Sequence, residues 1–518
     1  MLDLKITNGR VLDGTGAPWF RADVGVRGNV IVAVGDLANV SAAQTIDAKN
    51  RIVSPGFIDL LGQSESSVLT DPSVEAKVRQ GVTTEVTGEN RGPGPAVGPP
   101  TPERPWRTLA EFIQHLEKKG TAINFAFFVG AANARGIVIG DVNRAPTADE
   151  MHQMEQIIDQ AMRDGAIGLS TSLIYLPSMY SKTEELVNLA RVAAKYEGVY
   201  FSHMRDEGDR IDMALDEAFR IGREANIPIN IWHLKTAGRA NWGRMPHVVE
   251  RVEAARAEGI DVAANMYPYI ASSTSLSTMA PDWALEGGYD DLQRRLGVPD
   301  DRAKILETFR KGLERRGEHA VYVARVVNPE MKQYEKKFIE QIASEMGVPG
   351  DEALAKLFES NTTSPAAIFF SMSEDDVRTA MHQPWVAFGS DSGAPTPESR
   401  ASNNAVHPRA YGTFPRVIGH YARDEKLLTI EEAVRRMTSL AASRVKFYDR
   451  GMIRPGMKAD ITIFDPDTII DKATFEEPHQ FAEGVSDVIV NGVAVLRDGK
   501  MSGATPGKVI RGKGYAGK

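Results

Sequence analysis

Residues 199–233 have the sequence VYFSHMRDEGDRIDMALDEAFRIGREANIPINIWH, in which an amphipathic helical pattern separates two short apolar runs. The runs cover residues 199–203 and 227–233, and the helical pattern covers residues 211–225. A strand, a crossover helix and a second strand in this order are typical of a parallel sheet. Each run ends in a histidine, His203 and His233. This stretch therefore predicts a parallel α/β fold that carries polar groups where its strands end.

The same alternation extends through the middle of the chain. Eight strands are predicted, at residues 56–61, 83–87, 123–129, 167–171, 199–203, 227–233, 260–267 and 385–391. Eight strands with helical crossovers predict a (β/α)8 TIM-like barrel, which we assign to residues 55–454. About 115 residues separate the last two strands, where ~30 suffice for a strand–helix–strand step. We therefore expect a helical insertion at about 285–360, before the last barrel strand.

Both ends of the chain have short alternating strands of a different kind. Asn8-Gly9 and Asn491-Gly492 supply turn chemistry between apolar runs. Two all-β ends that flank a long middle predict one small β-sandwich domain, built from residues 1–54 and 455–518. The last residues, 508–518, are basic and rich in glycine, and we expect them to form a frayed terminus.

Composition excludes several classes of function. The 518 residues include 61 Lys and Arg against 69 Asp and Glu, a net charge of −8 with no long basic run, which argues against nucleic-acid binding. The chain has no cysteine, so disulfides, cysteine zinc sites and thiol nucleophiles are excluded. Neither a signal peptide nor a stretch of ~20 apolar residues is present, so we expect a cytoplasmic protein without a membrane partner.

Several predicted strands end in groups suited to metal or proton chemistry. Glu89 follows the second strand, His203 and His233 end the fifth and sixth, and Asp391 ends the eighth. The C-terminal ends of barrel strands meet at one face. A lone histidine at a strand end is usually a structural polar residue, but two on successive strands beside an aspartate indicate a metal-binding or proton-transfer site.

Motifs along nearly the whole chain support a specific resemblance. They are Gly165–Thr171 (GAIGLST), His203–Gly208 (HMRDEG), Tyr267–Tyr269 (YPY), Gly389–Asp391 (GSD) and His407–Arg416 (HPRAYGTFPR). In order and spacing these resemble the N-acyl-D-amino-acid deacylase (D-aminoacylase) family of the amidohydrolase superfamily. The resemblance implies a barrel with a split β-domain. It also implies a small-molecule substrate, an N-acyl amino acid of D configuration. The amide bond would be hydrolysed by a metal-activated water with Asp391 as the general base.

The sequence departs from that family at the metal site. Leu61 and Gln63 stand where the family has a His-x-His pair on strand one. Leucine cannot bind a metal, so we expect one divalent ion, Zn²⁺, in place of two. The family's strand-two cysteine is also missing. We favour Glu89 as the third ligand beside His203 and His233, because a carboxylate binds zinc better than a carboxamide, and Asn90 remains the alternative.

The resemblance also implies how a substrate is held. Positions matching Lys235, Arg409, Tyr175 and Ser273 bind the substrate carboxylate in the family. Lysine and arginine are cations suited to that role, the arginine through a bidentate fork. Tyr267 is expected to donate to the carbonyl oxygen of the scissile amide.

Two other functions are compatible with the same residues. One is hydrolysis of a different amide or of a cyclic imide, because loops set substrate choice. The other is a non-catalytic binding protein that has lost the strand-one metal ligands, against which the retained His203, His233 and Asp391 argue. A monomer and a homo-oligomer are both compatible with the sequence.

Overall fold

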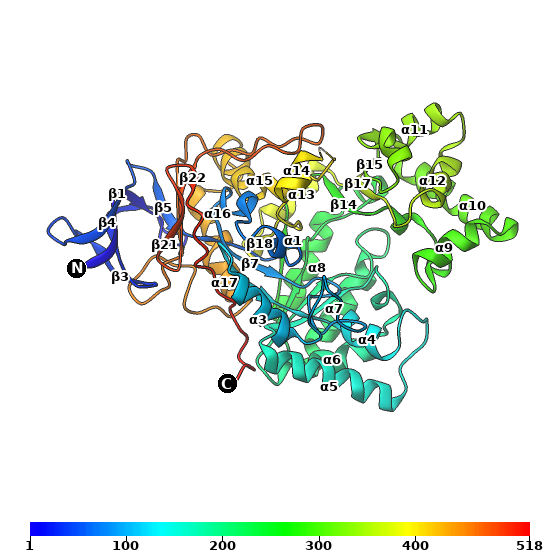
Figure 1. The fold of residues 1–518 in the computed structure, drawn as a ribbon, viewed down its shortest axis with the longest axis horizontal. Coiled ribbons are helices and arrows are strands. Elements are labelled where there is room, and N and C mark those ends of the chain that lie inside the picture. The colour runs from blue at the N-terminus through cyan, green and yellow to red at the C-terminus, as the bar shows by residue number, and fades with distance from the viewer. Residues whose placement is uncertain (403, 518) are drawn as a thin grey trace.

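The computed structural model describes residues 1–402 and 404–517 of an α/β protein. Parallel strands surrounded by helices occupy its centre (Figure 1). A sheet made from both termini lies at one end of the long axis, and a lobe formed by α9 (Tyr289–Leu296), α10 (Pro299–Arg316) and α12 (Gly350–Glu359) lies at the other. The candidate site is at the centre, between these two ends.

The central strands follow the predicted order. Each of the eight predicted segments contains a parallel strand. Their bounds are β6 (Phe57–Asp59), β7 (Val82–Thr87), β8 (Asn124–Phe127), β9 (Val129–Gly130), β10 (Gly168–Ser172), β11 (Val199–His203), β12 (Ile229–Ile231), β13 (Val262–Met266) and β18 (Val386–Phe388). They form a sheet β6-β7-β8 and a sheet β18-β13-β12-β11-β10-β9. The Asp391 amide donates to the Leu61 carbonyl at 2.7 Å, which joins the two sheets beside the site.

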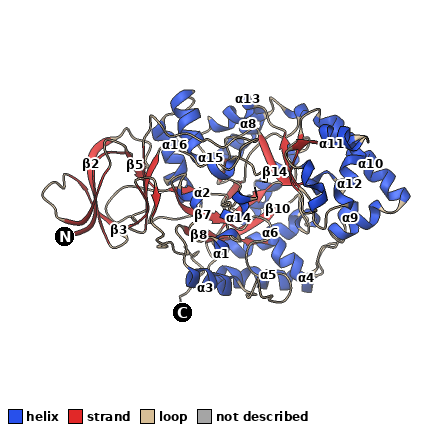
Figure 2. Cartoon of the chain, turned by 45° about the horizontal axis from the view of Figure 1, so that its top comes forward, coloured by secondary structure: helices blue, strands red, loops and turns tan. Residues whose placement is uncertain are grey.

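Helices cover the outer side of these strands (Figure 2). They are α1 (Ser67–Thr70), α2 (Glu75–Val78), α3 (Leu109–Lys119), α4 (Ala131–Val138), α5 (Ala148–Asp164), α6 (Thr183–Ala194), α7 (Ile211–Ala225), α8 (Met245–Ala257), α13 (Glu374–Met381), α14 (Pro397–Ala401), α15 (Arg409–Arg416), α16 (Ile430–Met437) and α17 (Ser439–Arg444). In α5, Thr147 and Glu150 form a capping box that fixes where the helix begins. In α7, Ile211 and Leu215 are buried, as the helical spacing of apolar residues predicts.

The termini share one nine-stranded sheet, in the order β22-β21-β20-β19-β5-β1-β2-β3 with β4 paired to β1. The strands are β1 (Leu2–Val11), β2 (Phe20–Arg27), β3 (Val30–Gly35), β4 (Ala42–Asp47), β5 (Ile52–Pro55), β19 (Ile461–Phe464), β20 (Val485–Val490), β21 (Val493–Arg497) and β22 (Lys500–Met501). β5 and β19 pair antiparallel. The sheet therefore joins the two ends of the chain across more than 400 residues of sequence.

The prediction of a frayed C-terminus over residues 508–518 is wrong for residues 508–512. The Phe125 amide donates to the Lys508 carbonyl at 3.0 Å, and the Ile510 amide donates to the Phe125 carbonyl at 2.7 Å. The Gly512 amide donates to Gly165 at 3.0 Å. These backbone bonds hold the segment against β8 whatever its side chains are, so a glycine-rich composition did not reveal them.

The insertion contains a sheet in addition to helices. A four-stranded sheet has the order β14-β17-β15-β16, all antiparallel. Its strands are β14 (Ala271–Ser275), β15 (Val321–Arg325), β16 (Lys337–Phe338) and β17 (Ala366–Phe370), and a further helix is α11 (Ile339–Met346). Apolar residues of the insertion, Phe309 and Phe358 among them, form a separate core cluster. The insertion is thus a packed unit that carries β14 and β17 to the edge of the site.

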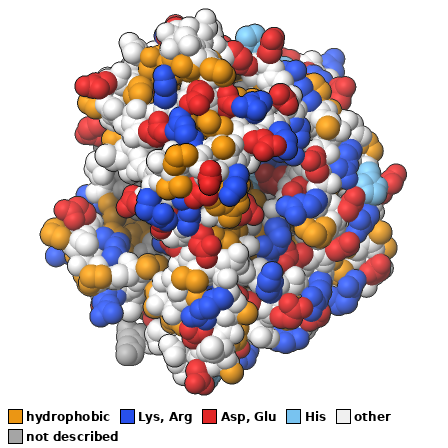
Figure 3. Space-filling model, turned by 90° about the vertical axis from the view of Figure 1, so that its right-hand side faces the viewer, with side chains coloured by type: hydrophobic (Ala, Val, Ile, Leu, Met, Phe, Trp, Pro, Cys, Tyr) orange, Lys and Arg blue, Asp and Glu red, His pale blue; other side chains and the backbone are white. Residues whose placement is uncertain are grey.

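Charged and apolar side chains are mixed on the surface at the insertion end of the molecule. On the face shown in Figure 3, acidic, basic and apolar side chains are interspersed. This agrees with the dispersed charge of the sequence. None of the described helices has both the length and the apolar character of a membrane span.

Candidate functional site

A cavity of about 500 Å³ opens at the C-terminal ends of the central strands. Its lining includes Gln63, Glu65, Glu89, Asn90, Ile174, Tyr175, His203, Glu207, His233, Lys235, Ala237, Tyr267, Ser272, Ser273, Thr274, Thr278, Arg316, Phe369, Ser371 and Asp391. Eight of the nine predicted site residues are in this set. The ninth, Arg409, forms an ion pair with Asp391, which lines the cavity. The volume is in the range of pockets for small molecules.

Glu89, His203 and His233 come together as a candidate metal centre. Their ligand atoms all lie within 4.8 Å of one another. Glu89 Oε1 is 3.0 Å from His203 Nδ1 and 3.5 Å from His233 Nε2. The second ring nitrogen of His203, Nε2, is buried without a hydrogen-bond partner. One carboxylate and two imidazoles match the three protein ligands of a catalytic zinc site, and the His203 Nε2 atom is not engaged in a hydrogen bond. A site of this type leaves its fourth position for water.

The charges at this centre favour an ionised carboxylate. Burial opposes ionisation of Glu89, but hydrogen bonds and charges from His203 and His233 hold its pKa well below the usual range. Burial and Lys235 lower the pKa of His233, yet Glu207 and Asp391 outweigh them and raise it to about 9. A divalent ion binds a neutral imidazole, so an ion that bound here would displace a proton from His233.

Glu207 belongs to the site, although the sequence analysis gave it no role. Its Oε1 lies 2.8 Å from His233 Nδ1 and accepts from Lys235 Nζ at 2.6 Å. Burial opposes its ionisation, but Lys235 and the two histidines lower its pKa. A carboxylate behind a metal-binding imidazole orients the ring. The sequence does contain a feature that could have pointed to it, because Glu207 follows the strand-end His203 by four residues in HMRDEG.

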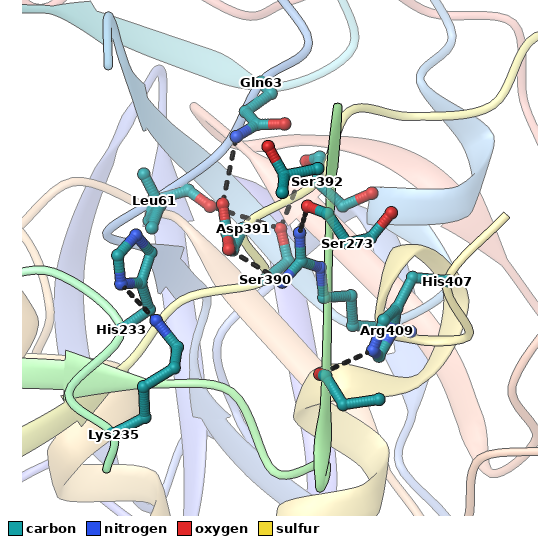
Figure 4. Close-up of polar contacts among 12 residues, drawn as sticks. Leu61, Gln63, His233, Lys235, Ser273, Ser390, Asp391, Ser392, His407 and Arg409 are labelled. Atoms are coloured by element: carbon teal, nitrogen blue, oxygen red, sulfur yellow. Dashed lines mark hydrogen bonds and ion pairs between the residues drawn. The ribbon is translucent and has the colours of Figure 1, made fainter. Parts of the chain in front are cut away.

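Asp391 lies between Gln63 and Arg409 (Figure 4). Gln63 Nε2 donates to Asp391 Oδ1 at 2.9 Å, and Arg409 NH1 lies 2.7 Å from Asp391 Oδ2. Burial raises the pKa of Asp391, and Arg409 and His233 offset part of that rise. Both carboxylate oxygens are therefore fixed in place, and the group accepts a proton more readily than an exposed aspartate.

The end of strand one differs from a metal-binding pair. Leu61 is buried in a core cluster. The Gln63 amide bridges two carboxylates, because its Nε2 donates to Glu89 Oε2 at 3.0 Å as well as to Asp391. A neutral amide thus joins the candidate metal ligand to the candidate base.

Asn90, the alternative ligand, also lines the cavity, and its Oδ1 is buried without a partner. Asn90, His233 and Asp391 have positive φ values of 58°, 37° and 49°. Such a backbone conformation is uncommon outside glycine and is concentrated at functional sites. The strand ends therefore turn sharply where these side chains enter the cavity.

Tyr267, Tyr175 and Ser273 line the same cavity from other elements. The Tyr267 hydroxyl is buried without a hydrogen-bond partner, and burial raises its pKa well above the usual value, so it stays a neutral donor. Tyr175 shares a hydrogen bond of 2.6 Å with Thr274 Oγ1. The Ser273 carbonyl accepts from Arg409 NH2 at 3.2 Å.

The two predicted carboxylate-binding cations are already engaged. Lys235 contacts Glu207 and His233 Nδ1, at 2.6 and 2.7 Å. Arg409 contacts Asp391, and its guanidinium lies 4.6 Å from the centre of the Tyr267 ring. Both cations thus lie beside the centre, bound to carboxylates of the protein.

Comparison with known proteins identifies the family. The chain matches the Amidohydrolase family over residues 44–496. It is 35% identical to the D-aminoacylase of Alcaligenes xylosoxydans xylosoxydans, over 98% of this chain and 97% of that protein. The chain belongs to the amidohydrolase family. This confirms the resemblance carried by the motifs.

Two solved structures place metals in relatives of this amidohydrolase. A D-aminoacylase with a binuclear metal centre is 36% identical, with a TM-score of 0.83 over 98% of this chain and 99% of that one. The N-acyl-D-glutamate deacylase of Bordetella bronchiseptica, complexed with zinc and a phosphonate mimic of the tetrahedral intermediate, is 33% identical, with a TM-score of 0.83 over the same shares. The interpretation of Glu89, His203 and His233 as a metal-binding cluster agrees with both of these structures.

Proposed function

We propose that this amidohydrolase hydrolyses the amide bond of N-acyl amino acids of D configuration. The observation that carries the proposal is the meeting of Glu89, His203 and His233 with Asp391 in one cavity. The relatives named above support the substrate class. A non-catalytic binding protein would have no need of a buried carboxylate held by Gln63 and Arg409 beside the candidate metal ligands.

Glu89, His203 and His233 would hold one divalent ion, with Zn²⁺ as our proposal. When bound, such an ion lowers the pKa of water and polarises a carbonyl. Asp391 accepts the proton of the attacking water and returns one to the leaving nitrogen. The unpaired Tyr267 hydroxyl donates to the carbonyl oxygen as negative charge develops on it.

The substrate carboxylate is bound by Lys235, Arg409, Tyr175 and Ser273. Lys235 and Arg409 keep contact with Glu207 and Asp391 while their remaining N–H groups face the carboxylate. Arg409 Nε is buried without a hydrogen-bond partner, which leaves a donor for this purpose. Binding at this point sets the scissile amide beside Asp391.

One metal ion is proposed in place of the two of a binuclear centre. Leu61 is in the core, and Gln63 donates to Glu89 and Asp391 through its amide nitrogen. The carboxamide oxygen that remains is a weaker zinc ligand than the histidine nitrogen it replaces. Metal-saturated protein should therefore contain close to one equivalent.

We further propose that the eight central strands close into a (β/α)8 barrel over residues 55–454. The hydrogen bond between Asp391 and Leu61, and the adjacency of β8 and β9, support closure. Residues 1–54 and 455–518 would form the small β-sandwich, apart from 508–512, which bond to the central unit, and 285–360 would form the core of the insertion.

The deciding experiment combines substrate and metal. Purified, metal-saturated protein is assayed on matched N-acetyl-D- and N-acetyl-L-amino acids, on free amides and on a cyclic imide, with elemental analysis of the same sample. We expect one metal equivalent and hydrolysis of D substrates above the others. Cleavage of the cyclic imide alone would assign a different amide substrate. Protein that binds metal and cleaves nothing in the panel would contradict the proposed function.

A further inference from the structure

Arg316 is a cavity residue that the proposed function does not use. It is the last residue of α10, so it comes from the insertion and not from a central strand. Its guanidinium stacks over the ring of Phe369, 5.1 Å from the ring centre. The side chain is partly buried, and its Nε atom is buried without a hydrogen-bond partner.

The other cations at the cavity have counter-ions within the protein. Lys235 pairs with Glu207, and Arg409 pairs with Asp391. In the part of the chain that the structure describes, no carboxylate forms an ion pair with Arg316. Burial, with the charge of Arg315, lowers the pKa of Arg316 to about 10. It therefore remains charged at neutral pH, and a partly buried charge without a counter-ion is unfavourable unless a ligand supplies one.

The surroundings of Arg316 suit an anion. Thr278 and Ser371 line the same cavity and bring hydroxyl groups, and neither of them carries a charge. A second cavity of about 630 Å³ shares Arg316, Thr278 and Glu207 with the first. Arg316 thus lies where the two cavities adjoin, on a wall different from that of the strand-end cluster.

We propose that Arg316 is a specificity-determining residue that binds a second carboxylate of the substrate, remote from the scissile amide. The inference rests on the proposed function and narrows it to N-acyl amino acids that carry two carboxylates. The second carboxylate can come from an acidic side chain, as in N-acyl-D-glutamate, or from the far end of the acyl group, as in an N-succinyl amino acid.

Matched substrate pairs test the proposal in the metal-loaded enzyme. N-acetyl-D-glutamate is compared with N-acetyl-D-glutamine, and N-succinyl-D-alanine with N-butanoyl-D-alanine. Arg316→Gln should lower kcat/KM for one carboxylate substrate by roughly 10- to 100-fold, the scale of a charged hydrogen bond, and change its neutral partner little. Arg316→Lys should recover part of the loss. The pair that responds identifies the source of the carboxylate.

Arg315→Gln is the matched control. Arg315 precedes Arg316 on the same last turn of α10 but is exposed and paired with Asp209 at 3.0 Å. Arg315 lines the second cavity but not the first, so its substitution removes a charge at the same helix end without removing a group from the first cavity. Both substrate pairs should therefore respond far less than they do to Arg316→Gln. Arg316→Gln should also leave Tm unchanged or raise it, because it removes an unpaired buried charge.

Two results would overturn the assignment. One is an Arg316→Gln variant that slows the charged and neutral members of both pairs equally. The other is a wild-type enzyme that favours neither carboxylate substrate over its neutral partner. Each is distinct from failure of the proposed function, in which wild-type enzyme with bound metal cleaves no N-acyl amino acid at all.

Discussion

The two walls of the cavity are built in opposite ways. The strand wall lies at and beside the ends of the central strands, and Arg409 belongs to it through its ion pair with Asp391. Its lining residues are Glu89, Tyr175, His203, Glu207, His233, Lys235 and Asp391. Its charged groups are buried or partly buried and contact one another. The insertion wall consists of Ser273, Thr274, Thr278, Arg316 and Phe369. It has neutral hydroxyls, an aromatic ring and one cation without a counter-ion in the described chain.

The construction of the strand wall suits catalysis, and that of the insertion wall suits substrate recognition. A network in which each charge fixes its neighbour holds geometry closely, as proton transfer and metal binding require. A wall of hydroxyls with an unpaired cation has hydrogen-bonding groups left for a ligand. Substrate choice can therefore change through residues of the insertion wall while the strand wall stays the same.

The largest expected effect comes from removing a ligand from the strand wall. Glu89→Ala should lose metal and activity together, by more than the 10- to 100-fold typical of losing a partner behind a metal ligand. Asn90→Ala should keep most of its metal. Elemental analysis of both variants beside activity assays decides between them. The opposite ranking would make Asn90 the ligand and Glu89 its neighbour.

Asp391→Asn tests the proton transfer on the same wall. The amide keeps the size of the side chain but cannot accept a proton, so the rate should fall by roughly 10²-fold or more while metal content stays constant. Burial raises the pKa of Asp391, so the wild-type rate should fall as pH drops through that raised value. The variant should lack this acidic limb. Near-normal turnover with metal bound would remove Asp391 from the mechanism.

The strand wall was largely predictable from the sequence. Apolar runs, helical spacing and a polar residue at a strand end are local features, so the sequence alone predicts that Glu89, His203, His233 and Asp391 lie together. Glu207 was missed, although it follows His203 by four residues, because its contact with His233 depends on how the turn after β11 folds back.

The insertion wall was not predictable in the same way. β14 pairs with β17 across roughly 90 residues, and no local pattern reveals a non-local antiparallel pairing of this kind. The pairing of Arg409 with Asp391, and the unpaired state of Arg316 among the described residues, follow from side-chain positions on separate elements. Sequence motifs predicted which residues carry the chemistry, and the structure adds which cations already have counter-ions.

Arg409→Lys tests whether a cation of the strand wall also binds substrate. Lysine keeps the charge but lacks the planar fork, so transition-state binding should weaken by ~1–3 kcal/mol. Converting the substrate carboxylate to an amide should weaken transition-state binding by a similar amount in the wild type. In the variant, the same conversion should weaken it little further. Measuring kcat/KM for both enzymes on both substrates gives the coupling free energy between Arg409 and the substrate carboxylate. Equal rates for masked and free substrate in wild type would mean that the enzyme prefers a neutral amide.

The smallest expected effect concerns the contact between the two walls. Tyr175, on the loop after β10, shares a hydrogen bond with Thr274 of β14. Burial raises the pKa of Tyr175, so the phenol is neutral and can donate. Tyr175→Phe removes the hydroxyl, and Thr274→Val removes its partner with little change of shape. Loss of one neutral hydrogen bond is worth about 0.5–1.5 kcal/mol, so each variant should lower kcat/KM by roughly 2- to 12-fold.

The two variants should differ if Tyr175 also contacts the substrate carboxylate. Thr274→Val leaves the phenol free to donate to the substrate, whereas Tyr175→Phe loses both partners, so the tyrosine variant should be the slower one. The difference should disappear with a substrate whose carboxylate is masked. Equal kcat/KM values for the two variants on the free acid would assign Tyr175 to the contact between the walls alone. Substrate recognition on the strand side would then rest on Lys235 and Arg409.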